Sequence, residues 1–269
     1  MISSRLVATR HGDMHIRSTE RAGFQTAPNP PLLCLHPCPF SGLYFTTIMP
    51  LIADRGLALA PDYPGYGHSY IPQTTPAPSI RDYAAALLEL LDVLDLETPI
   101  DALGFHTGGL VGLELAVLAP HRFRRLLLID VPCHDEAQRL ELMTAPIAQP
   151  FPVDNPSALA AARRQHTQTR EGAMSPSRIN ELFAEHERVL PRAHWGFRAA
   201  YSYDWQARAI ALRTPTRLIA TRSTLLDPTR AAAAALPGAA LIERLDIRRA
   251  VFEEGAPVIA GELRQWLDS

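Results

Sequence analysis

Short apolar runs alternate with longer amphipathic stretches along most of this chain, a pattern typical of strands and helices in an α/β sheet. From Tyr83 to Leu94, for example, apolar residues recur on one helical face, and Ser79 can cap the start of that helix. The predicted strands are Leu6–Thr9, His15–Thr19, Leu32–His36, Leu57–Ala60, Ile100–Phe105, Leu126–Asp130, Arg217–Ala220 and Leu241–Leu245. The predicted helices are Leu43–Asp54, Ile80–Leu94, Gly108–Leu118, Thr229–Leu236 and Pro257–Leu267.

This alternation is lost between Cys133 and about Leu212, where charged and aromatic residues replace the β-branched runs. We interpret residues 133–212 as a helical insertion into a core domain formed by residues 1–132 and 213–269. An insertion at this point would lie over the carboxyl ends of the strands, where open α/β sheets bind ligands, and would act as a cap or lid. Its polar residues are expected to face solvent, namely His166, His186, His194, Glu181, Glu185 and Arg188.

Composition narrows the classes of protein. The 269 residues suit one core with an insertion. The 26 basic and 28 acidic residues give no electrostatic footprint for nucleic acid. No run reaches the ~18 apolar residues of a membrane span.

The start lacks the pattern of a secretory signal and the three cysteines cannot all pair, so we expect a cytoplasmic protein with reduced thiols. All basic residues are Arg, which excludes Schiff-base chemistry on lysine.

Three segments carry the chemical signal, and their order matters. Leu32–Gly42 is a buried strand that runs into a proline-rich loop, and Ala60–Ser69 is a strand end followed by a tight Gly/Pro turn. Ile100–Gly109 passes from a strand to a helix through closely spaced glycines.

With these segments the chain resembles the α/β-hydrolase superfamily over nearly its whole length. Ile100–Gly109 is similar to the nucleophile elbow, Gly-x-nucleophile-x-Gly, and Ala60–Ser69 is similar to the loop D-x-P-G-x-G-x-S. The resemblance implies an α/β-hydrolase fold with about eight mostly parallel strands, flanking helices and a helical cap inserted after the sixth strand. It also implies a strained central residue in the elbow, with room only for glycine at Gly104 and Gly108.

The departures from the family pattern are the most informative part of the sequence. The tip of the elbow, usually Ser and sometimes Asp or Cys, is His106. Ala250 stands where the catalytic histidine is expected, and no histidine follows His194. The usual place of the acid holds Thr224, with Asp227 three residues later.

An imidazole at the tip can do chemistry alone, because with a reference pKa near ~6.5 it is largely neutral and basic at physiological pH. His106 could attack a carbonyl directly or deprotonate a water, and we favour the general base because imidazole is too long for a carbonyl placed for serine attack. The expected orienting acid is Asp130, at the end of the sixth strand, with Asp227 as second choice. The resemblance also implies an oxyanion hole made of two backbone N–H groups. One belongs to Thr107 and the other to Cys38 or Phe40.

Several neighbours have simpler interpretations. His36 is expected to order the oxyanion loop by hydrogen bonding, as its family equivalent does, while Cys133 and His134 are expected to line the pocket. Cys34, His36 and Cys38, with Cys133 or His134 as fourth ligand, could be taken for a zinc site, but the spacing matches no standard zinc pattern. We therefore expect no metal and no cofactor.

The leading functional hypothesis is a hydrolase of a small, fairly apolar ester, lactone or related carbonyl compound, with a small-molecule substrate and no cofactor. A second hypothesis is a binding or accessory protein that keeps the fold without catalysis, favoured by the missing terminal histidine. A third is a cofactor-free lyase or isomerase in which His106 moves a proton.

Overall fold

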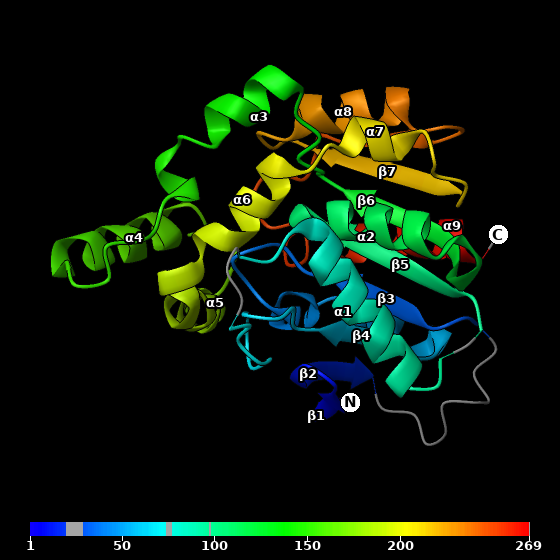
Figure 1. The fold of residues 1–269 in the computed structure, drawn as a ribbon, viewed down its shortest axis with the longest axis horizontal. Helices are drawn as coiled ribbons and strands as arrows, with labels where there is room; N and C mark the ends of the chain where they lie inside the picture. Colours follow the sequence, from blue (N-terminus) through cyan, green and yellow to red (C-terminus); the bar gives the residue numbers. More distant parts are fainter. Residues whose placement is uncertain (20–28, 74–76, 97, 269) are drawn as a thin grey trace.

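A single twisted sheet organises the chain. The computed structural model describes residues 1–19, 29–73, 77–96 and 98–268. In this described part eight strands lie in the order β1-β2-β4-β3-β5-β6-β7-β8 (Figure 1). Their bounds are β1 Ile2–Thr9, β2 Gly12–Thr19, β3 Leu32–Leu35, β4 Ala58–Pro61, β5 Ile100–Phe105, β6 Phe123–Ile129, β7 Thr216–Thr221 and β8 Ala240–Arg244.

Strand direction matches the prediction of a mostly parallel sheet. β1 pairs antiparallel with β2, and β2 pairs antiparallel with β4. Every pair from β4 to β8 is parallel. The carboxyl ends of the parallel strands therefore meet at one edge, so the residues that follow them are brought together.

Helices cover both faces of the sheet and fill the segment between β6 and β7. The α-helices are α1 Ile80–Val93, α2 Thr107–Leu118, α3 Glu136–Leu142, α4 Pro156–Gln168, α5 Pro176–Val189, α6 His194–Ser202, α7 Trp205–Ala209, α8 Leu226–Ala235 and α9 Ala256–Leu267. The 3₁₀ segments are η1 Gly42–Phe45, η2 Met49–Arg55, η3 Pro120–Arg122, η4 Pro146–Ala148 and η5 Leu190–Arg192. No helix in the described ranges is both long and apolar enough to cross a membrane.

The α-helix predicted over Leu43–Asp54 was wrong, because this stretch forms the two 3₁₀ segments η1 and η2. Pro50 lies in the first turn of η2, lacks an N–H and disfavours the helical conformation of the preceding residue. The backbone bonds here span three residues, as in Ile48 N–H to the Phe45 carbonyl at 3.1 Å.

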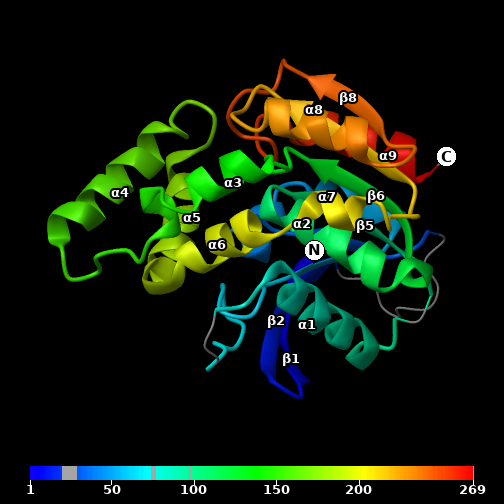
Figure 2. The same ribbon diagram turned by 45° about the horizontal axis from the view of Figure 1, so that its top comes forward.

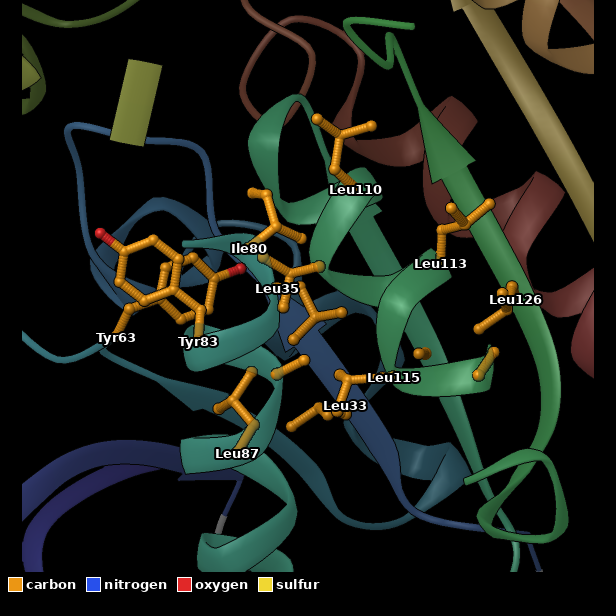
Figure 3. Packing of buried hydrophobic residues seen from close by; sticks show 14 of the residues in the cluster. Leu33, Leu35, Tyr63, Ile80, Tyr83, Leu87, Leu110, Leu113, Leu115 and Leu126 are labelled. Atoms are coloured by element: carbon orange, nitrogen blue, oxygen red, sulfur yellow. The ribbon is translucent and has the colours of Figure 1, made fainter. Parts of the chain in front are cut away.

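The core lies on both faces of the sheet, because successive strand residues point to opposite sides. On β3, Leu33 and Leu35 pack with α1 and α2, as Figure 3 shows. Leu32 and Cys34 belong to the other cluster, which includes residues of η1, η2 and α9. The two apolar layers hold β3 and β5 rigidly at the centre of the sheet.

Helices α4 and α5 stand apart from both flanking layers, next to the carboxyl edge of the sheet (Figures 1 and 2). Polar contacts connect this segment to the core. Arg178 of α5 pairs with Glu253 at 3.0 Å and donates to the Leu43 carbonyl at 2.9 Å. In α6, the Gly196 N–H donates to the Tyr66 hydroxyl at 2.7 Å.

The turn from β5 to α2 depends on two glycines. A Cβ on Gly104 would lie 2.6 Å from the Gly108 carbonyl oxygen, and a Cβ on Gly108 would lie 1.9 Å from the Leu35 carbonyl oxygen. Real Cβ atoms do not come this close to backbone, so the first turn of α2 can rest on the end of β3 only when both residues are glycine.

Gly108→Ala is expected to lower the free energy of unfolding by about 3 kcal/mol, because backbone on both sides must move. Gly261→Ala, in the exposed middle of α9 with open space around it, is the control and should raise it by about 0.5–1 kcal/mol. Urea unfolding of both variants measures the difference. Equal effects would show that the close approach does not constrain this turn.

Candidate functional site

His106 occupies the turn between β5 and α2 with positive φ, as the sequence predicted. Its φ is 51° and its ψ is −120°. Its N–H donates to the Ile129 carbonyl at 3.0 Å, and its carbonyl accepts from Gly109 N–H at 2.8 Å. The ring packs against Phe105 with 4.0 Å between ring centroids and remains half-buried. The turn thus presents an imidazole at the carboxyl edge of the sheet.

Two effects keep this imidazole neutral. Burial lowers the pKa of His106 to about 4, and the positive charge of Arg170 acts in the same direction. The ring nitrogens have no hydrogen-bond partner among the described residues. At neutral pH one ring nitrogen is therefore a free proton acceptor.

Two backbone N–H groups next to His106 are available as donors. Thr107 is the first residue of α2, so its N–H has no acceptor within the helix. The Cys38 N–H has no acceptor among the described backbone bonds. The Phe40 N–H, our alternative second donor, donates to the Pro37 carbonyl at 3.0 Å and is not free. Of the two predicted donors in this loop, only Cys38 remains.

The Cys38 side chain is an inert thiol. It is buried against Tyr66 and Thr107, and burial raises its pKa to about 12. At neutral pH it carries no thiolate, so Cys38 contributes through its backbone.

His36 orders the loop that follows β3, as expected. Its Nδ1 donates to the Pro37 carbonyl and its Nε2 accepts from the Tyr63 N–H, each at 3.0 Å. The ring stacks on Tyr63 at 3.8 Å, and burial lowers its pKa to about 4. Because both nitrogens are engaged, His36 supports structure and cannot also bind a metal.

Asp130 lies beside His106 in the sheet but does not orient its ring. The β5–β6 register pairs Phe105 with Ile129, which puts the two following residues side by side. The Asp130 carboxylate instead accepts from the Thr221 backbone N–H at 2.8 Å and from the Thr221 hydroxyl at 2.5 Å. Burial raises its pKa, with these bonds opposing the rise. It therefore anchors the end of β7.

Asp227 does not supply an acid to the site, and Ala250, at the position expected for the catalytic histidine, does not supply a base. The Asp227 side chain is 88% exposed and pairs with Arg230 at 3.1 Å on the surface of α8. Ala250 is fully buried. The structure therefore does not bring the second-choice acid to His106.

The residues considered above as zinc ligands do not form a metal site. Among the described residues no three His, Cys, Asp or Glu side chains form a group that could hold a metal. Cys34 and Cys133 are buried and desolvation raises the pKa of both thiols. His134 is half-buried, and its carbonyl accepts from the Trp205 indole N–H at 2.7 Å.

His166 was expected to face solvent, and this was wrong; His186, for which the same was expected, is half-buried. His166 is 5% exposed and its Nε2 bonds the Ile179 carbonyl at 3.1 Å. The Phe40 ring lies 6.1 Å from His166 and 5.7 Å from His186. Burial lowers the pKa of each histidine to about 4, and Arg170 contributes. Arg170 was not predicted from the sequence, because its neighbours in the chain form no motif that distinguishes it from the other arginines.

Glu185 was also expected on an exposed, salt-bridged face, but it is 6% exposed. The Ser41 hydroxyl donates to its carboxylate at 2.5 Å. Ser41 precedes η1, so this bond connects α5 to the loop that also carries Cys38 and Phe40.

Asp62 holds the loop after β4. Its carboxylate accepts from His15 Nδ1, Arg17 and the Gly42 N–H, each at 2.8 Å, and from the His68 N–H at 3.0 Å. Burial opposes ionisation, but the bond from His15 and the charge of Arg17 outweigh it and lower the pKa of Asp62. The ionised carboxylate thus joins β2, the start of η1 and the turn after β4.

Two cavities are described, and His106 lines neither. An open depression of about 530 Å³ lies between residues 172–175 and the loop before α9, where Arg178 and Glu253 form part of its wall. A second, of about 510 Å³, lies beside α1 around Tyr70 and Tyr83. His106 as a residue is partly exposed.

Comparison with known proteins shows which family this chain belongs to. The model of the alpha/beta hydrolase fold family matches residues 30–239. "Putative carbamate hydrolase RutD" of Pseudomonas syringae is 32% identical over 222 residues, which cover 75% of this chain and 80% of the relative. A pimeloyl-[acyl-carrier protein] methyl ester esterase of Photobacterium profundum is 34% identical over 100 residues, which cover 36% of this chain and 35% of that protein.

Solved structures show the same fold. A hydrolase from Pseudomonas aeruginosa superposes with a TM-score of 0.76 at 21% identity, covering 99% of this chain and 98% of the other. An enol-lactonase from Burkholderia xenovorans gives a TM-score of 0.75 at 17% identity, covering 98% of this chain and all of the other.

Replacing Asp62 by Asn should lower the free energy of unfolding by about 3 kcal/mol at neutral pH, since the Arg17 charge is left without its buried partner. Because the pKa of Asp62 is lowered in the folded protein, its contribution is present above the unfolded value of ~3.9 and is lost as the pH falls below it. Asp92→Asn, at a 65% exposed carboxylate paired with Arg122, is the control and should cost at most about 1 kcal/mol. Denaturant unfolding at neutral and acidic pH measures both. A constant Asp62 effect across pH would contradict the ionised network.

Proposed function

The chain belongs to the α/β-hydrolase superfamily, and its relatives are named as hydrolases and esterases. From this premise we propose that it is a hydrolase that cleaves a small ester, lactone or related carbonyl substrate at His106. One observation carries the proposal: the positive-φ turn presents a neutral imidazole next to two unused backbone N–H groups. This arrangement suits water attack on a carbonyl whose oxygen binds those donors.

In the proposed reaction His106 acts as general base. The imidazole takes a proton from a water while the water oxygen bonds to the substrate carbonyl carbon. The Thr107 and Cys38 N–H groups stabilise the negative charge on the carbonyl oxygen. The tetrahedral intermediate then collapses, and the imidazolium returns the proton to the leaving alcohol oxygen. No bond to the protein forms, and one water is consumed per bond cleaved.

Among the described residues, no carboxylate hydrogen-bonds the His106 ring. The Asp130 carboxylate is bound to Thr221, and the His106 ring is positioned by packing on Phe105. Without a carboxylate the imidazolium formed in the reaction is less stabilised, so we expect slower turnover than a complete triad would support.

The segment between β6 and β7 acts as a cap in this proposal. Support comes from its contacts with both loops of the site: Glu185 bonds Ser41, and Gly196 bonds Tyr66. These contacts hold α5 and α6 over the carboxyl edge and limit the size of the substrate.

A second candidate function is ligand binding without hydrolysis. The observation that favours it is the buried Ala250 at the place where the family carries its catalytic histidine. Turnover separates the two candidates, because a binding protein would be stabilised by small carbonyl compounds and leave them intact.

His106→Ala should reduce kcat/KM on a turned-over ester at least about 100-fold, because the base is removed. Asp227→Asn, on the exposed face of α8, is the control and should leave kcat/KM unchanged. Both variants should unfold at wild-type denaturant concentrations. An active His106→Ala enzyme would refute the mechanism.

The pH profile should reflect a neutral base. Because the pKa of His106 is lowered to about 4, kcat/KM should rise as the pH increases through about 4 and stay level through neutral pH. Steady-state rates in buffers of constant ionic strength test this. An acid limb at the ordinary histidine pKa of ~6.5 would contradict the described burial.

A further inference from the structure

Arg170, just beyond α4, places its guanidinium on the core domain. Its central carbon lies 5.4 Å from the centroid of the Phe40 ring. One terminal nitrogen donates to the His166 carbonyl at 3.1 Å and to the Thr169 hydroxyl at 3.0 Å. One nitrogen of the guanidinium is thus bound to its own segment, while the plane of the group lies over Phe40 in the loop after β3.

This cation forms no salt bridge within the described part of the chain, although Glu253 is close enough for its charge to act on that carboxyl. No carboxylate lies within 4.0 Å of it, and its Nε is buried without a hydrogen-bond partner. Glu253, the acid whose pKa Arg170 affects, is bound through one oxygen to Arg178 at 3.0 Å. A sheltered guanidinium with an unused donor is costly unless an anion reaches it.

A second unused group lies beside it. The Nδ1 of His186 is buried without a partner, and its ring lies 5.7 Å from the Phe40 ring and 6.2 Å from the His166 ring. A neutral imidazole can donate one hydrogen bond. Arg170 and His186 thus offer donors of two kinds around the same aromatic ring.

An aromatic wall runs from this cluster toward His106. Phe40 lies 5.2 Å from Tyr44, Tyr44 lies 5.5 Å from Phe105, and Phe105 packs on the His106 ring at 4.0 Å. The charge of Arg170 also acts on Tyr44, in the middle of this wall, and on His106, at its end. Arg170 and His106 thus contact opposite ends of one row of packed aromatic rings.

We propose that Arg170 and His186 bind a carboxylate on the substrate while its ester or lactone carbonyl faces His106. The inference rests on the proposed hydrolase function and narrows the substrate class from fairly apolar carbonyl compounds to carboxylate-bearing ones. A monoanion fits better than a phosphate dianion, because a single guanidinium supplies the charge and Glu253 lies near. A planar carboxylate also matches the fork of an arginine.

Kinetics test the proposal with matched substrates: monomethyl succinate, glutarate and adipate against their dimethyl esters. Wild type should prefer the half-esters in kcat/KM by about 10- to 100-fold, the value of a charge-assisted hydrogen bond. Arg170→Met keeps an apolar stem over Phe40 and should abolish this preference. Arg163→Met is the control, because it removes a guanidinium of the same segment that stacks at 5.2 Å on Phe183 and not on Phe40. It should retain the preference.

Binding separates this inference from the hydrolase proposal. In His106→Ala protein, monomethyl glutarate should bind by calorimetry and dimethyl glutarate should not, and adding Arg170→Met should remove the binding. Half-ester binding without wild-type turnover would support the anion site and refute hydrolysis. Turnover without preference for the half-ester, or a preference that survives Arg170→Met, would overturn the anion site and leave hydrolysis standing. Neither binding nor turnover would refute both.

Discussion

The contact between the first turn of α2 and the end of β3 is the constraint on which the rest of the site depends. With no side chain on Gly108, the helix rests directly on the Leu35 carbonyl. This closeness brings the Thr107 N–H next to the loop that carries the Cys38 N–H, and His106 connects β5 to this turn with positive φ. This one contact therefore positions His106 and the N–H groups of Thr107 and Cys38, although Cys38 lies about 70 residues before the other two in the chain.

Buried polar groups then hold the neighbouring loops against this turn. His36 uses both ring nitrogens to join the loops after β3 and β4, and Asp62 joins β2 to those same loops. His36 does so without charge, while Asp62 does so as an ion compensated by Arg17. Because His36 and Asp62 are satisfied, these loops adopt one arrangement. Arg170 and His186 differ from them, since each has a buried nitrogen without a hydrogen-bond partner, and both lie around the same Phe40 ring.

Prediction succeeded where the signal is local. Short apolar runs identified all eight described strands, and the glycine spacing identified the strained turn at His106. It failed where partners are distant in the chain. Glu185 looks exposed on its helix, but Ser41 lies 144 positions away, and the burial of His166 depends on Phe40. Asp130 was placed correctly at the end of its strand. Its carboxylate binds Thr221 and not His106 because of the direction of the side chain, which the spacing of residues in the sequence does not encode.

The two proposals are coupled through electrostatics. Arg170 acts with burial to lower the pKa of His106, so the empty site holds a weak base. An anion bound to Arg170 would offset that charge and make the imidazole more basic at the moment when a substrate is present. A neutral ester of the same shape would leave the base weak. Substrate charge would then act on the chemical step as well as on binding, and the absence of an acid behind His106 would be partly offset by the carboxylate that the substrate brings.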